Sequence, residues 1–306
     1  MNPAWSVIVF TTIAGAAQGL VVALALATLT GVRTAPLFLS HTLLMALVML
    51  GIGLASSFFH LGRPERAWRA AAMWRTSWLS REVIVLPAFT GAVALWWWLG
   101  VAAPAAWLLA CVVLSFVLWW CTGMIYACLR FIQEWAHPLT IAGFVLIGLS
   151  SGLVLAGGLA AGAGEAELLK AVSPWALGAT LAAWGTRYAA LRRNATLAAK
   201  STLQSATGIP AKRLRQTSMG MSAGAFNTRE FFHGRTLALL RQVKSACFVL
   251  AFAAPSLLLL WAQRSDAGGW PWALALLLQV PGLLAERWFF FAQARHPQNL
   301  YYQVVS

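Results

Sequence analysis

Stretches of about twenty mostly apolar residues recur along this chain, and each is long enough for a helix to cross a bilayer. The first runs from Trp5 to Leu29 and contains no charged residue. It is too long for the core of a signal peptide and no small-residue cleavage site follows it, which indicates a retained helix. Seven further spans are expected at Pro36–Leu61, Val83–Leu99, Pro104–Leu129, Leu139–Leu159, Ser173–Leu191, Ser245–Ala262 and Trp270–Phe291.

The composition supports solvation by lipid. Apolar residues make up 60% of the 306 residues and charged residues only 10%, whereas a soluble globular domain carries about 25% charged residues. The same composition excludes intrinsic disorder, a disulfide-stapled secreted module and a collagen-like fibre. We therefore expect an all-α integral membrane protein, with eight transmembrane helices in one bundle and residues 1–306 as a single domain. Glycines near positions 100 and 164 should close two of its hairpins, and the span Ser173–Leu191 requires Arg187 to snorkel to the interface from its last turn.

Basic residues are concentrated on one side of the expected bundle. Lysine and arginine number 22 against 8 acidic residues, a net charge of +14. With eight spans, the side that holds both termini receives all basic residues except Arg33, Lys170 and Arg264. The positive-inside rule makes that side, and both termini, cytoplasmic, so the charge indicates orientation and not a nucleic-acid partner. On the same side, Trp68, Trp74 and the neighbouring arginines predict a short segment in the membrane interface, facing lipid phosphates.

Ionisable residues gather where the second span ends and the third begins. The strings FFHLGRPERAW and SWLSREV place His60 and Glu82 at similar depth on adjacent antiparallel helices. An imidazole and a carboxylate are suited to exchange the two protons of a quinone. The alternative is structural: His60 caps a helix C-terminus, and Glu82 pairs with Arg81 or Arg66.

The chain offers few residues for a redox centre of its own. A bis-histidine haem needs two histidines on facing helices at matching depth. His41 has no such partner, which leaves His60 with His137, and His137 precedes Pro138 in a loop-like turn. An iron–sulfur cluster needs four converging thiolates, whereas three of the four cysteines lie along one span. We expect no haem or cluster in this chain, and a haem b-containing membrane anchor is the alternative.

Two other classes of membrane protein stay open. A secondary transporter needs a midplane substrate site and helices interrupted at corresponding positions in two halves. Pro255 and Pro281 are the only hints of such interruptions, and Gln18, Thr42 and Gln279 offer a polar thread through the core. The other class is a purely structural anchor, in which replacing Glu82 leaves quinol-linked turnover intact.

The longest polar stretch covers residues 192–242, between the sixth and seventh spans. A structureless loop of this length is uncommon and usually functional. One interpretation is a solvated cytoplasmic loop. The other is a docking platform for a soluble partner, with contact residues Phe226, Arg229, Phe231 and Phe232.

The strings FFHLGRPERAW, SWLSREV and FNTREFFHG resemble the membrane anchor subunits of dimethyl sulfoxide reductase-type molybdopterin oxidoreductases, over nearly the whole chain. The third string resembles the branch that includes sulfite dehydrogenase anchors. The resemblance implies a non-catalytic anchor in the bacterial cytoplasmic membrane, which holds a molybdopterin catalytic subunit and an iron–sulfur subunit. Such anchors pass electrons between an exchangeable quinone, such as menaquinone, and the nearest cluster without haem.

The resemblance also assigns residues. The histidine of the HLG motif is His60 and the glutamate of SREV is Glu82, and both are implicated in quinol binding and proton exchange, with Arg66 carried over from the connecting segment. Since this pair lies on the basic side, we expect the iron–sulfur subunit to dock there, beside residues 192–242. Protons and electrons are then exchanged on one side, so turnover should not itself charge the membrane. The substrate and the direction of electron flow are properties of other chains.

Overall fold

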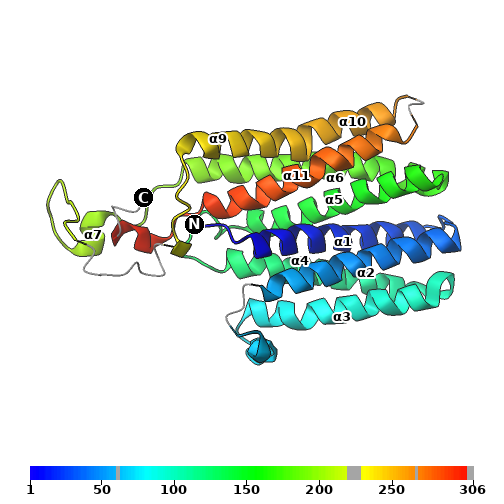
Figure 1. Cartoon of the computed structure of the whole chain (residues 1–306), viewed down its shortest axis with the longest axis horizontal. Coiled ribbons are helices and arrows are strands. Elements are labelled where there is room, and N and C mark those ends of the chain that lie inside the picture. The colour runs from blue at the N-terminus through cyan, green and yellow to red at the C-terminus, as the bar shows by residue number, and fades with distance from the viewer. Residues whose placement is uncertain (60–62, 219–228, 266–267, 302–306) are drawn as a thin grey trace.

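The computed structural model describes residues 1–59, 63–218, 229–265 and 268–301, and this part of the chain contains helices and no strand. Long helices lie side by side in one bundle (Figure 1). They are α1 (Trp5–Leu29), α2 (Pro36–Phe58), α3 (Trp78–Leu99), α4 (Ala105–Ala127), α5 (Pro138–Ala163), α6 (Ala166–Ala195) and α11 (Trp270–Ala292). A further long helix is a continuous run of α9 (Leu237–Ala246), the π-helical η3 (Cys247–Ala253) and α10 (Ala254–Ala262).

Seven helices in the described residues are long and apolar enough to cross a membrane. They comprise α1 to α5, the run from α9 to α10, and α11. This finding confirms an all-helical, multi-pass membrane protein. The sixth expected span corresponds to α6, which has 30 residues and lies along α5 but is less apolar than the others. Its crossing of the membrane stays a prediction.

The third span begins earlier than the sequence analysis predicted. Helix α3 starts at Trp78 instead of Val83, because the Ser77 side chain caps it by accepting a hydrogen bond from the Ser80 backbone N–H. Glu82 therefore lies within the helix and not at its start. The two hairpin turns expected at glycine-rich positions are present, with Gly100 and Gly164 at φ values of +57° and +76°.

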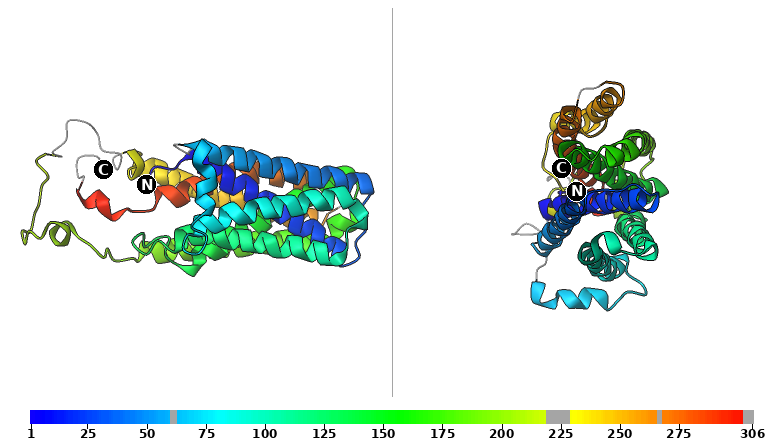
Figure 2. Two further views of the ribbon diagram at one scale, coloured as in Figure 1. Left: turned by 90° about the horizontal axis from the view of Figure 1, so that it is seen from below. Right: turned by 90° about the vertical axis from the view of Figure 1, so that its right-hand side faces the viewer.

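Helix α1 lies at the centre of the bundle, against α2, α4, α5 and α11 (Figure 2, right). Its contact with α5 is a backbone-to-backbone approach at glycines. A Cβ added at Gly19 would lie 2.1 Å from the Gly148 carbonyl oxygen, and one added at Gly152 would lie 2.1 Å from the Gly19 carbonyl carbon. Small residues at such an interface let two helices pack closely in a lipid environment, and these three glycines set the distance between α1 and α5.

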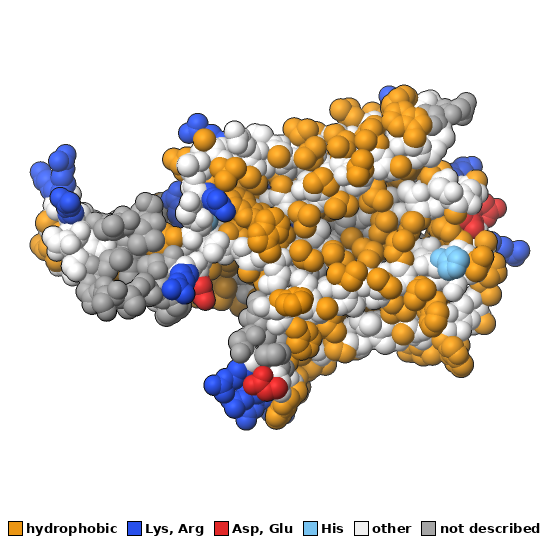
Figure 3. Space-filling model, in the orientation of Figure 1, with side chains coloured by type: hydrophobic (Ala, Val, Ile, Leu, Met, Phe, Trp, Pro, Cys, Tyr) orange, Lys and Arg blue, Asp and Glu red, His pale blue; other side chains and the backbone are white. Residues whose placement is uncertain are grey.

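One end of the bundle carries most of the extramembrane structure. The N-terminus, the short helices η1 (Pro64–Ala71), α7 (Leu203–Thr207) and η4 (Pro297–Tyr301), and residues 128–137 all lie there (Figures 1 and 2). Lysine and arginine side chains are concentrated at this end, whereas hydrophobic side chains cover the flank of the helices (Figure 3). We call it the basic end.

The polar stretch 192–242 is helical at both of its ends. Its first residues complete α6, and its last residues belong to α9, which begins after the capping residue Thr236. Between them, α7 contacts η4 through a hydrogen bond of 2.9 Å from the Tyr301 hydroxyl group to the Ala206 carbonyl oxygen. The segment is thus tied to the C-terminal part of the chain.

Candidate functional site

Glu82, on α3, carries a buried carboxyl group that faces α4, and the residue is only 6% exposed. The Thr122 hydroxyl group, from α4, donates a hydrogen bond to Glu82 Oε1. The neighbouring Arg81 side chain points elsewhere: it donates to the Trp74 and Arg75 carbonyl oxygens and stacks on the Trp78 ring at 4.1 Å. Neither ion pair formed by the described residues includes Glu82, so the alternative pairing of Glu82 with Arg81 or Arg66 is not formed.

The other residues expected at this site lie apart from Glu82 or outside the described chain. His60 falls among residues 60–62, outside the described ranges, so its pairing with Glu82 stays a prediction. Arg66 is exposed on η1, which stands away from the bundle at the end of α2 and α3 (Figure 2). Trp68 and Trp74 are also exposed there, and each carries a guanidinium group over its ring. This arrangement suits a segment that lies in the lipid interface.

The expected docking residues lie at the basic end. Phe226 is outside the described ranges, and Arg229 is exposed. Phe231 is half-buried and stacks on the His296 ring with centroids 3.8 Å apart. Phe232 is half-buried as well. Part of this aromatic surface therefore contacts the chain's own C-terminal segment, and the docking role stays a prediction.

The first two residues, Met1 and Asn2, form a strap that joins the segments around Glu230 and Ala294 at the basic end. The Met1 ammonium group donates a hydrogen bond of 2.8 Å to the Ala294 carbonyl oxygen, and the Asn2 backbone N–H donates one of 2.8 Å to the Glu230 carbonyl oxygen. Burial lowers the pKa of the Met1 amino group to about 6. Burial also lowers the pKa values of His233 and His296, with a further contribution from the positive charge of that ammonium group.

His137, one of the two histidines considered for haem, caps a helix. It precedes α5, and its Nδ1 accepts a hydrogen bond of 3.2 Å from the Leu139 backbone N–H. Its pKa is lowered by burial and by the nearby Arg193 charge. Among the described residues, no three His, Cys, Asp or Glu side chains are grouped so that they could hold a metal ion.

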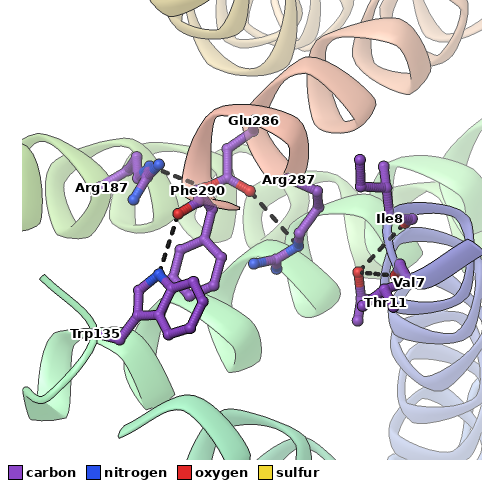
Figure 4. Close-up of polar contacts among 8 residues, drawn as sticks. All are labelled: Val7, Ile8, Thr11, Trp135, Arg187, Glu286, Arg287 and Phe290. Atoms are coloured by element: carbon purple, nitrogen blue, oxygen red, sulfur yellow. Dashed lines mark hydrogen bonds and ion pairs between the residues drawn. The ribbon is translucent and has the colours of Figure 1, made fainter. Parts of the chain in front are cut away.

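Arg187, Glu286 and Arg287 form a buried charged cluster that was not expected from the sequence. Arg187 Nε lies 2.9 Å from Glu286 Oε1, and Arg287 Nε lies 3.5 Å from Glu286 Oε2. All three residues are at most 5% exposed, and Figure 4 shows the Glu286 carboxylate between the two guanidinium groups. The snorkelling expected for Arg187 is therefore wrong, because its charge finds a partner inside the bundle. The signal for this cluster was present: Glu286 and Arg287 stand inside the last expected span.

Aromatic side chains surround this cluster. The Arg287 guanidinium group lies 4.0 Å from the Phe144 ring centroid, and Arg187 lies within 6.0 Å of the rings of Phe289 and Phe290. The Trp135 Nε1–H donates a hydrogen bond of 3.1 Å to the Phe290 carbonyl oxygen (Figure 4). Cation–π contacts of this kind stabilise guanidinium groups that have lost water.

Two small cavities adjoin the charged cluster. The inner cavity lies between α1, α4, α5 and α11, and polar groups of Gln18, Trp119, Thr122 and Arg287 line it. The end cavity lies nearer the basic end and is lined by Glu134, Arg187, Glu286 and Arg287. Both have room for water-sized molecules and too little for a ring system.

Comparisons with known proteins agree with this architecture. The family model described as DMSO reductase anchor subunit (DmsC) matches residues 1–293. One subunit of the sulfite dehydrogenase of Allochromatium vinosum is 46% identical over 100% of both chains. The anaerobic dimethyl sulfoxide reductase chain YnfH of Escherichia coli is 30% identical over 36% of this chain and 40% of its own length.

Proposed function

The chain belongs to the DMSO reductase anchor subunit family, and on that premise we propose that it is the quinone-reactive anchor of a three-subunit molybdopterin oxidoreductase. In this proposal it passes electrons between membrane quinone and an iron–sulfur subunit, which in turn serves a molybdopterin catalytic subunit. The full-length likeness to a sulfite dehydrogenase subunit favours electron flow from sulfite to quinone.

The observation that carries the quinone role is the buried Glu82 carboxyl group. A membrane-embedded acid is costly, so it is rarely retained without a function. The Thr122 hydroxyl group fixes Oε1, whereas Oε2 accepts no hydrogen bond from the described residues. Glu82 can therefore present one oriented oxygen to a quinone hydroxyl or carbonyl group.

The chemistry divides between the quinone and the chain. A bound quinone supplies the two-electron redox change, and the chain holds and moves the protons that accompany it. Glu82 accepts or returns one proton at its free carboxyl oxygen, and His60 exchanges the other at its imidazole ring. Arg66, on the exposed η1, is positioned to contact lipid phosphates or the quinone entrance.

The orientation follows from charge. We propose eight crossings, with α6 as the sixth, because α6 packs along α5 and its Arg187 charge is neutralised inside the bundle. The basic end then faces the cytoplasm of a bacterial cell. The iron–sulfur subunit docks at this end, beside residues 192–242 and the contact residues Arg229, Phe231 and Phe232.

Binding of a fluorescent quinol analogue to membranes that contain the assembled complex tests this proposal. Wild type should quench the analogue to saturation at one site, and His60→Ala and Glu82→Gln should remove that quenching. Glu167→Gln is the matched control, because Glu167 is an acidic residue in the first turn of α6, at the opposite end of the bundle. Unchanged quenching in both site variants would move the quinone site elsewhere, and no quenching in wild type would leave a purely structural anchor.

A further inference from the structure

A proton that reaches Glu82 needs a way to the aqueous phase, because the residue is almost fully buried. Its hydrogen-bond donor, Thr122, offers one. The Thr122 side chain bonds to Glu82 and also lines the inner cavity. The hydroxyl group therefore stands between the carboxyl group and a polar space inside the bundle.

The inner cavity is lined by polar atoms that have no protein partner. Thr12 Oγ1, Gln18 Oε1 and Trp119 Nε1 are buried and form no hydrogen bond within the described chain. Unsatisfied buried polar groups are costly, and these three atoms face a cavity with room for about one water, which needs two to four such partners. The lining thus points to water and not to an apolar ligand.

Arg287 is the polar residue that lines both the inner cavity and the end cavity. In the end cavity, Arg187 Nη2 also lacks a hydrogen-bond partner among the described residues, and Glu286 Oε2 has only its 3.5 Å ion pair with Arg287. The far wall includes Glu134, a half-buried residue in the segment that joins α4 to α5 at the basic end. Polar groups of the two cavities therefore lie between Glu82 and Glu134.

We propose that ordered water in these two cavities forms a route by which protons pass between the Glu82 carboxyl group and Glu134 at the basic end. The proposal rests on the quinone function, which gives Glu82 a proton to exchange. The route opens at the basic end of the bundle, so the protons that quinone reduction consumes enter from the side from which the electrons come.

Each transfer conserves protons. After Glu82 has given its proton to the quinone, the Thr122 O–H bond breaks as its proton passes to Glu82 Oε1, and the Thr122 oxygen accepts a proton from water in the inner cavity. Each water in turn gives up one proton and accepts one from its neighbour, back to Glu134, whose O–H bond breaks and whose carboxylate is protonated again from solvent. The same steps in reverse release protons when quinol is oxidised. Arg287 stays protonated throughout and orients the water on either side.

The charges along the route balance. Two arginines and one glutamate alone would leave a net positive charge that repels a proton, but Glu134 supplies a second negative charge to the end cavity. Arg187, Arg287, Glu286 and Glu134 together carry no net charge when ionised. The net charge along the route is therefore zero and does not repel a proton, whereas two buried arginines alone would repel it.

Glycine positions on two helices provide a matched test. A Cβ at Gly15 would lie 3.8 Å from the Gly148 Cα and 4.0 Å from Trp119 Nε1, so Gly15→Ala adds a methyl group to the wall of the inner cavity without a clash. Gly158→Ala is the control, because its Cβ has equally ordinary contacts at 3.9 Å and Gly158 lines neither cavity. Gln18→Leu and Glu134→Gln remove one polar group at each end of the route.

The measurement is hydrogen–deuterium exchange of the Glu82 carboxylic acid, followed by infrared spectroscopy of the complex in membranes at a pH where that acid is protonated. The band is assigned by its loss in Glu82→Gln. Gly15→Ala, Gln18→Leu and Glu134→Gln should each slow exchange by about tenfold, the effect of about 1.4 kcal/mol on a barrier. Gly158→Ala should exchange as wild type does.

Equal exchange rates in wild type and all four variants would overturn the route, and so would slowing in Gly158→Ala as large as in Gly15→Ala. The experiment uses no quinol, so its outcome is separate from that of the quinol-binding test. Slowed exchange together with absent quinol binding would keep the proton route and remove the quinone site. Wild-type exchange rates in the route variants, together with quinol binding that depends on Glu82, would keep the quinone site and remove the proton route.

Discussion

Replacing Gly152 by alanine tests how closely α1 and α5 must approach. The new Cβ would lie 2.1 Å from the Gly19 carbonyl carbon and 2.2 Å from its Cα. Carbon atoms prefer a separation of about 3.5–4.0 Å, so the helices must move apart by about 1.5 Å. Because the obstructing atoms are backbone, no side-chain rotation can relieve the contact.

The expected magnitude follows from two opposing effects. Overpacking of this kind costs about 1–3 kcal/mol, and the rigid obstruction puts Gly152→Ala near the upper limit. Alanine regains about 1 kcal/mol over glycine within a helix, which leaves a net loss of about 2 kcal/mol. Gly158→Ala on the same helix has no contact closer than 3.9 Å and should gain up to about 1 kcal/mol.

Thermal unfolding of the purified complex in detergent compares the two variants. One kcal/mol corresponds to about 2–4 °C in a chain of this size class, so Gly152→Ala should lower the apparent Tm by about 5 °C and Gly158→Ala should raise it slightly. Equal stability of the two alanine variants would refute the close α1–α5 contact.

Two further predictions concern charged groups. Glu286→Gln should destabilise the chain by about 3–5 kcal/mol, because it leaves two buried guanidinium groups without a counter-charge. Replacing Arg187 and Glu286 together by methionine should cost less stability. A thermal-unfolding series in which the double variant is the least stable would contradict the charged cluster. Lowering the pH from 8 to 6 should loosen the strap at Met1, His233 and His296. Their pKa values are lowered in the folded state, so these groups bind protons more readily when the strap is released, and the stability of the strap falls as the pH is lowered through this window. Amide hydrogen exchange of residues 229–237, corrected for intrinsic rates, should accelerate at pH 6, and a pH-independent corrected rate would contradict the prediction.

The sequence predicted the helical bundle well because apolar length is a strong signal. Seven of the eight expected spans are helices long and apolar enough to cross a membrane. The largest boundary differences are at helix starts: α3, α6 and α9 begin before Val83, Ser173 and Ser245, at Trp78, Ala166 and Leu237. Ser77 moved the start of α3 by five residues relative to Val83, since the first turn of a helix can be polar when its N–H groups are capped. The mean hydropathy of a window of residues does not detect such a polar first turn.

The charged interior was not predictable in the same way. Arg187 was expected to reach the interface because snorkelling is the usual fate of an arginine near the end of a span. Its partner, Glu286, is far away in sequence, and only the packing of both α6 and α11 against α5 and η3 brings the two together. The Thr122 contact with Glu82 is equally non-local, since a threonine within an apolar helix gives no sign of which helix it will face.

The central claim, that quinone reacts beside Glu82, is tested most directly by the rate at which quinone reoxidises the complex. The iron–sulfur clusters of the assembled complex are reduced chemically, mixed with a quinone analogue, and followed by electron paramagnetic resonance. Glu82→Gln should slow reoxidation by about a hundredfold, the lower range of what a positioned proton-transfer group contributes, whereas Glu167→Gln should match wild type. Reoxidation at the wild-type rate in a fully assembled Glu82→Gln complex would contradict the account.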